Sequence, residues 1–83
     1  MKYQAWDVLL KVKNESYDKM DSVIKVRLPF TTVNARLIQH SMGYDFYLVD
    51  TVFFDADIDR RQVRKSLIDH DGYPSNIVVD RAR

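Results

Sequence analysis

The segment from Tyr44 to Asp55, YDFYLVDTVFFD, most limits what this chain can fold into. Its residues alternate with the two-residue period that is typical of a β-strand. Both sets of alternating side chains are rich in apolar residues: Phe46, Leu48, Val52 and Phe54 with Asp50 on one side, and Tyr47, Val49, Thr51 and Phe53 on the other. We therefore expect a central strand with something covering each of its two sides.

Three further segments alternate in the same way and predict strands. They are residues 5–13, residues 24–30 and residues 76–83. The polar segment 14–22 separates the first two, so these two are expected to pair as a wide hairpin. Pro29 cannot donate to a β-ladder and marks a strand end or an edge.

Two segments predict helices. Over residues 31–42, Val33 and Leu37 share one apolar arc, Thr32 can cap the start, and Gly43 follows where a left-handed cap is expected. His40 falls on the polar side of this segment and is expected to be solvated. Over residues 57–71, aspartates cluster at the start, an apolar pair faces inward, and a glycine and a proline follow the end.

The resulting order is β-β-α-β-α-β in 83 residues, enough for a single domain over 1–83. Two crossover helices favour a two-layer α+β sandwich, a four-stranded sheet with both helices on one face. The other sheet face would then be open, and it would carry Tyr47, Val49 and Phe53. We expect this apolar patch either to contact a partner or to be covered by the 14–22 loop.

Composition excludes several classes of protein. The chain has no cysteine, so disulfides, thiolate metal sites and cysteine nucleophiles are absent, and its net charge is only +1. No run approaches the ~20 apolar residues of a membrane span. The N-terminal residues lack the form of a signal peptide. These features predict a cytoplasmic protein without a membrane partner.

The acidic and histidine motifs do not predict a catalytic or metal site. A calcium loop starting at Asp55 would place Arg60 where glycine is needed and Ser66 where glutamate is needed. The Asp69–Asp71 segment carries a histidine between two aspartates, but adjacent helical side chains point about 100° apart and cannot converge on one ion. We expect no cofactor, no metal and no enzyme activity.

The predicted second helix carries a basic arc formed by Arg60, Arg61, Arg64 and Lys65, with Ile68 inside it. Such an arc can bind phosphates with a salt-dependent affinity. It can equally be a solvated face balanced by the preceding aspartates. The apolar Ile68 among the arginines is more typical of a protein contact. Base stacking on Tyr47 and Phe53 is disfavoured because the segment lacks the RNA-recognition consensus and holds Asp50 and Asp55.

The segment SLIDHDGYP, residues 66–74, with the strand that follows it, resembles the C-terminal part of small bacteriophage accessory and inhibitor proteins. The resemblance implies a compact non-enzymatic protein that binds or inhibits a macromolecule, in an infected host cell. The primary hypothesis is a module that binds a protein partner or a second copy of itself. It would use the patch at Tyr47, Val49 and Phe53 or the basic arc. The alternative is a nucleic-acid-binding protein that uses the basic arc.

Overall fold

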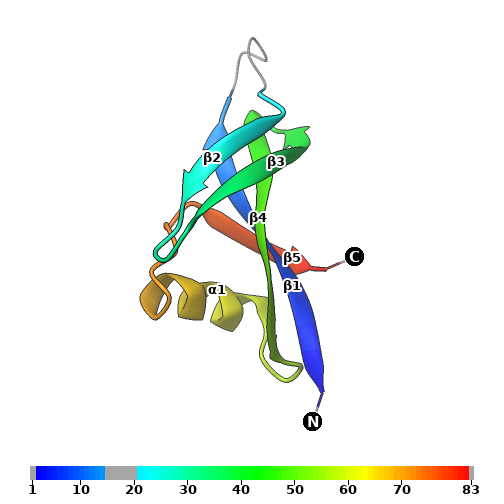
Figure 1. The fold of residues 1–83 in the computed structure, drawn as a ribbon. Coiled ribbons are helices and arrows are strands. Elements are labelled where there is room, and N and C mark those ends of the chain that lie inside the picture. The colour runs from blue at the N-terminus through cyan, green and yellow to red at the C-terminus, as the bar shows by residue number, and fades with distance from the viewer. Residues whose placement is uncertain (1, 15–20, 83) are drawn as a thin grey trace.

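One antiparallel five-stranded sheet forms most of the computed structural model, which describes residues 2–14 and 21–82. The strands lie in the order β2-β3-β4-β1-β5, and a helix connects β4 to β5 (Figure 1). The element bounds are β1 Tyr3–Lys13, β2 Val23–Arg27, β3 Thr32–Ser41, β4 Tyr44–Asp55, α1 Arg60–Asp69 and β5 Ile77–Arg81.

The prediction of a four-stranded sheet with two helices is wrong, because residues 32–41 form the strand β3. Val33 pairs with Val26 and Ala35 with Ile24 on β2, so alternate side chains turn toward the core. Val33 and Leu37 are four residues apart, so they share a face both in a helix and in a strand, and in a short segment the two patterns are hard to tell apart. Met42 and Gly43 both have positive φ, 53° and 81°, and form a two-residue hairpin turn to β4.

The middle strand of the sheet is β4, as expected, and the long strand β1 lies between β4 and β5 and does not pair with β2. Strand β1 pairs with β4 along 3–13 and with β5 along 6–10. The predicted hairpin between the first two strands is therefore wrong. Most of the 14–22 segment that was expected to connect or cover them lies outside the described residues. The strands predicted at 5–13, 24–30 and 76–83 are confirmed with shifted ends, and the strand predicted at 44–55 is confirmed with the same ends.

A bulge between β1 and β4 changes which side chains of β4 face inward. Val8 pairs with Asp50 and Leu9 with Leu48, so Val49 is an extra residue on β4. On the two sides of the bulge, residues of opposite parity face the core. Tyr47, paired with Leu10, and Val52, paired with Trp6, consequently face the same side of the sheet, toward the core. The single alternation expected from the sequence across 44–55 is therefore wrong.

Local signals define the helix α1. Asp59 caps it: its Oδ1 accepts a hydrogen bond from the Gln62 backbone N–H at 2.9 Å, and Gln62 Oε1 accepts from the Asp59 backbone N–H at 3.1 Å. Val63 and Leu67 are buried, as expected from their spacing. The second predicted helix is thus confirmed with shorter bounds, Arg60–Asp69 in place of 57–71, and of the clustered aspartates only Asp59 caps it.

The core lies between α1 and the side of the sheet that the helix covers. Val8 and Val79 are fully buried beside Val63, with Leu67 and Ile77 nearly so. Trp6, Leu10, Val26, Leu28, Ala35, Tyr47 and Val49 complete the buried cluster. Within the described ranges, no helix is long and apolar enough to cross a membrane.

Candidate functional site

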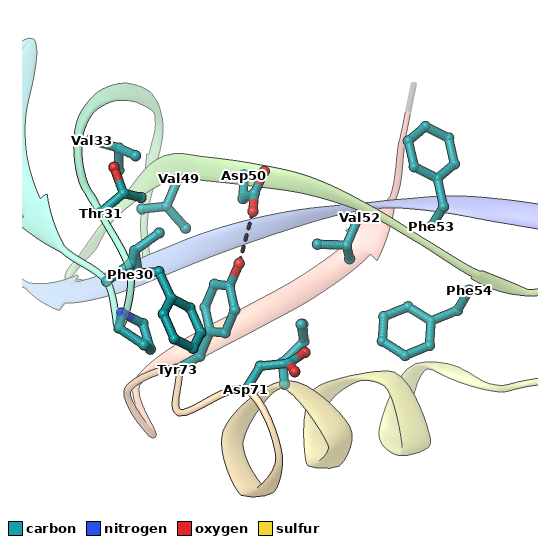
Figure 2. A pocket seen from close by; sticks show the side chains of 13 residues that line it. Phe30, Thr31, Val33, Val49, Asp50, Val52, Phe53, Phe54, Asp71 and Tyr73 are labelled. Atoms are coloured by element: carbon teal, nitrogen blue, oxygen red, sulfur yellow. Dashed lines mark hydrogen bonds between the residues drawn. The ribbon is translucent and has the colours of Figure 1, made fainter.

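A groove of about 510 Å³ lies between the β2–β3 turn, the second half of β4 and the C-terminal end of α1. Figure 2 shows the side chains that line it. Its volume falls within the range of about 300–1,000 Å³ typical of sites that hold a small ligand or a few side chains. The lining residues are Leu28, Pro29, Phe30, Thr31, Val33, Val49, Asp50, Val52, Phe53, Phe54, Leu67, Asp71 and Tyr73.

The groove exists because β3 separates from β4 beyond Arg36 and continues to Thr32 paired only with β2. Pairing between β3 and β4 runs from Ser41 opposite Tyr44 only to Arg36 opposite Leu48. Pairing between β1 and β4 continues to Asp55. Past Leu48, β4 therefore has a strand on one edge only, and the β2–β3 turn stands apart from it across the groove.

The loop after α1 packs against this turn. Gly72 has φ of +75°, which disfavours any residue with a side chain, and an added Cβ would lie 3.1 Å from Pro29 Cγ. The Tyr73 backbone N–H donates to the Leu67 carbonyl at 3.0 Å and ties the loop to the helix end. This close approach holds Tyr73 and Pro29 at one end of the groove.

Apolar side chains form most of the groove. Val49 and Leu67 are buried, and Val52 and Phe54 are half-buried and point toward α1 in Figure 2. Two phenylalanines at the rim are exposed, Phe30 by 93% and Phe53 by 69%. Of these two rings only Phe30 lies over the groove, because Phe53 alternates with Val52 and Phe54 and points to the opposite face of β4 (Figure 2).

The charged groups that line the groove are all acidic. They are Asp50 and Asp71, and no lysine or arginine in the described ranges lines the groove. The Tyr73 hydroxyl donates to Asp50 Oδ2 at 2.7 Å, and the Thr51 backbone N–H donates to Asp50 Oδ1 at 2.8 Å. Burial, together with the hydrogen bond to Asp50, raises the pKa of Tyr73. The phenol therefore remains a hydrogen-bond donor at neutral pH and does not act there as a base.

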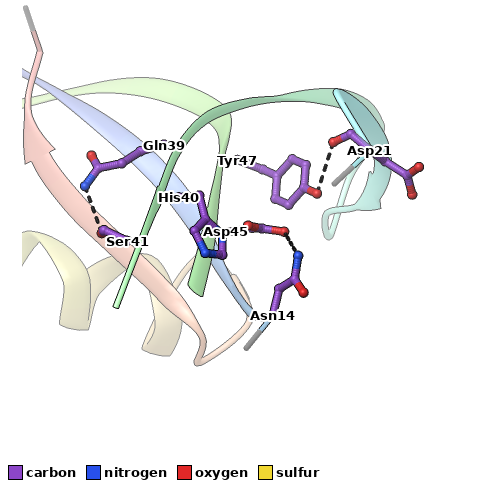
Figure 3. Close-up of polar contacts among 7 residues, drawn as sticks. All are labelled: Asn14, Asp21, Gln39, His40, Ser41, Asp45 and Tyr47. Carbon is purple, nitrogen blue, oxygen red and sulfur yellow. Dashed lines mark hydrogen bonds and ion pairs between the residues drawn. The ribbon is translucent and has the colours of Figure 1, made fainter. Parts of the chain in front are cut away.

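The three residues expected on an open sheet face do not share one. Tyr47 is 4% exposed, lies in the core, and donates its hydroxyl to the Asp21 carbonyl at 3.2 Å (Figure 3). Val49 is buried and borders the groove, and only Phe53 is exposed. The expectation of a shared exposed face is wrong because the bulge at Val49 turns Tyr47 inward.

The basic arc of α1 is divided between structural contacts and exposed surface. Arg64 Nε donates to the Ile77 carbonyl at 2.9 Å and its Nη2 to the Ser75 carbonyl at 2.6 Å. Arg60 forms an exposed ion pair with Asp80 at 3.2 Å. Ile68 packs against the core. Arg61 and Lys65 are exposed.

A buried polar cluster joins the β3–β4 hairpin to the end of β1, and it was not expected from the sequence. His40, expected to be solvated, lies directly across the ladder from Asp45 and its Nδ1 contacts Asp45 Oδ1. Asn14 Nδ2 donates to Asp45 Oδ2 at 2.9 Å (Figure 3). The hydrogen bond with His40 is the main cause that lowers the pKa of Asp45. The signal in the sequence was the spacing of His40 and Asp45 around the Met42-Gly43 turn, which is visible only once β3 is known to be a strand.

The described part of the chain contains no group of three metal-ligating side chains of the His, Cys, Asp and Glu types. The buried cluster supplies a histidine, an aspartate and an amide, already hydrogen-bonded to one another. No family model, curated protein or solved structure matches this chain.

Proposed function

We propose that this protein is a small binding module whose groove holds an apolar side chain of a partner protein, with a lysine or arginine of the same partner segment beside it. The observation that supports this is the composition of the groove. Its walls are apolar, the exposed Phe30 ring stands at its rim, and its charged lining groups among the described residues are both carboxylates. A segment with one apolar and one cationic side chain complements all three features.

The apolar contact supplies most of the expected affinity. Burying a phenylalanine or leucine side chain contributes about 1.5–3 kcal/mol. An exposed ion pair with Asp50 or Asp71 contributes about 0–1 kcal/mol. The carboxylates therefore act mainly in selecting the partner, because an acidic segment would place like charges together.

A random-peptide display library tests the proposal because it presents many candidate partner segments at once. Selection on the folded protein should enrich peptides with an aromatic or aliphatic residue near a lysine or arginine. The enriched peptide should bind Phe30→Ser at least about tenfold more weakly, since one large apolar contact is lost. Asp71→Asn should weaken binding by a smaller factor and reduce the preference for cationic peptides.

Met42→Asn is the matched control. Met42 is 94% exposed and lies at the β3–β4 turn, and asparagine tolerates its positive φ. This variant removes a large exposed apolar side chain outside the groove, so peptide binding should remain unchanged. Equal losses in Phe30→Ser and Met42→Asn would contradict the proposal. A dimer that dissociates only in Phe30→Ser would instead make a second copy of the chain the occupant.

A further inference from the structure

The face of the sheet opposite the main core gathers basic and aromatic side chains at one end. Residues directly paired in an antiparallel ladder project to the same side, and successive residues alternate. Lys11 pairs with Phe46 and Lys13 with Tyr44, whereas the intervening Leu10 and Tyr47 are buried in the core. Arg36 pairs with Leu48 and so lies on the same outer face.

Strand β2 extends this surface. Lys25 pairs with Asn34, two residues from Arg36, and Arg27 follows two residues after Lys25. Their neighbour Val26 points to the core. We call this surface the basic sheet face. Its members are Lys11, Lys13, Lys25, Arg27, Arg36, Tyr44 and Phe46.

Charge is separated along the sheet, although the whole chain carries only +1. None of the strand residues on this end of the outer face is an aspartate or a glutamate, since Asp45 faces inward toward His40. The acidic pair Asp7 and Asp80 lies on the same face toward the other end. Four strand residues, or about 13 Å, separate Asp7 from Lys11. This exceeds the Debye length of about 8–10 Å at physiological salt.

The aromatic rings lie among these cations. Tyr44 and Phe46 are half-buried neighbours on β4, and the Lys11 ammonium lies 4.1 Å from the centre of the Tyr44 ring. Surfaces that bind single strands combine aromatic rings, on which bases stack, with cationic side chains, which neutralise phosphates. A base that stacks on the Tyr44 face covered by Lys11 must displace that ammonium, which can then contact a phosphate.

We propose that the basic sheet face binds single-stranded nucleic acid, with bases against Tyr44 and Phe46 and phosphates against the surrounding lysines and arginines. This site is separate from the groove, and it does not depend on the function proposed for the groove. It also differs from the basic arc of α1, where Arg64 is committed to backbone carbonyls and Arg60 to Asp80. An acidic protein would satisfy the cations but would leave the rings without a role.

Fluorescence anisotropy with a labelled oligothymidine of about 12 nucleotides tests the proposal. Each phosphate contact contributes about −0.7 to the slope of log affinity against log salt, so five cations give up to about −3.5. Affinity should then fall by up to about 100-fold between 50 and 200 mM salt. The double variant Lys25→Gln/Arg36→Gln should make the slope shallower by about 1.4.

Two further variants separate stacking and location from simple charge. Phe46→Leu keeps an apolar side chain but removes the ring, and it should weaken binding at least about fivefold. Arg61→Gln/Lys65→Gln on α1 removes the same charge as the double variant on the sheet and should leave the slope unchanged. Circular dichroism confirms that each variant is folded.

Three outcomes would overturn the proposal. The first is no binding of the oligonucleotide at low salt. The second is an equal loss of slope in the α1 variant, which would show that any basic surface suffices. The third is unchanged binding by Phe46→Leu together with equal competition by polyglutamate, which would identify the ligand as an acidic protein surface.

Discussion

Replacing Gly72 by alanine tests how firmly the loop after α1 is held at the end of the groove. Gly72 has φ of +75°, and the left-handed conformation costs a residue with a Cβ about 1–2 kcal/mol. The added Cβ would also lie 3.1 Å from Pro29 Cγ, so the turn before β3 would have to shift by a few tenths of an ångström. We expect a loss of about 1–2 kcal/mol in the free energy of unfolding.

Thermal and urea unfolding measure this loss. For a domain of this size, 1 kcal/mol corresponds to about 4–8 °C, so Tm should fall by about 4–16 °C. Gly72→Asn separates the two causes, because asparagine tolerates positive φ but still carries the Cβ that approaches Pro29. If backbone strain dominates, Gly72→Asn loses less stability than Gly72→Ala. If the contact dominates, Pro29→Ala restores part of the stability of Gly72→Ala.

A Gly72→Ala variant whose free energy of unfolding lies within about 0.5 kcal/mol of the wild type, the range of ordinary surface substitutions, would refute this role of Gly72. The loop would then not need its positive φ. Gly72→Ala should also weaken peptide binding in the groove. The added Cβ would displace Pro29 or the loop that carries Tyr73, and both of these residues line the groove.

Two further substitutions test the contacts that join the strands. Arg64→Met should lower the free energy of unfolding by about 1 kcal/mol, because two charged hydrogen bonds are exchanged for water at an exposed site. The Asn76 carbonyl accepts a hydrogen bond from β1, so the Ile77 carbonyl, the next along β5, points to the free edge of the sheet, where Arg64 covers it. Exposing this carbonyl in Arg64→Met should increase self-association, measured by light scattering. An unchanged mass together with unchanged stability would contradict this role of Arg64. Asp45→Asn should remove a pH dependence of stability. The folded-state pKa of Asp45 is lowered, so its contribution is fully present above the unfolded pKa of about 3.9 and is lost as pH falls through the folded pKa. Urea unfolding between pH 5 and 2 should show a steeper acid loss for the wild type than for Asp45→Asn, and parallel curves would be evidence against the role of this carboxylate.

The helix was predictable because its signals are local. Asp59, Gln62 and the pair Val63 and Leu67 lie within nine residues of one another and define the start and the inner face of α1. The strands β1, β4 and β5 were predictable for the same reason, since a two-residue alternation is a property of a single segment.

The strand β3 was not predictable from its own residues. Val33, Ala35 and Leu37 fit a strand, while Val33, Leu37 and Ser41 fit a helical arc. Pairing decides between them, because residues 32–36 form a ladder with β2 and residues 36–41 form a ladder with β4, which gives each half of the segment backbone partners. The bulge at Val49 escaped prediction for a related reason, since it depends on the register with β1.

The sequence by itself determined that a helix lies within residues 57–71, where four of the five strands lie, and that cysteine chemistry is excluded. The tertiary structure alone decided the strand order, the inward position of Tyr47 and both proposed binding surfaces. The groove joins Phe30, Val52 and Tyr73, and the basic sheet face joins Lys11, Lys25 and Phe46. These residues are distant along the chain. Only the pairing of whole strands, which depends on burying the shared core, brings them together.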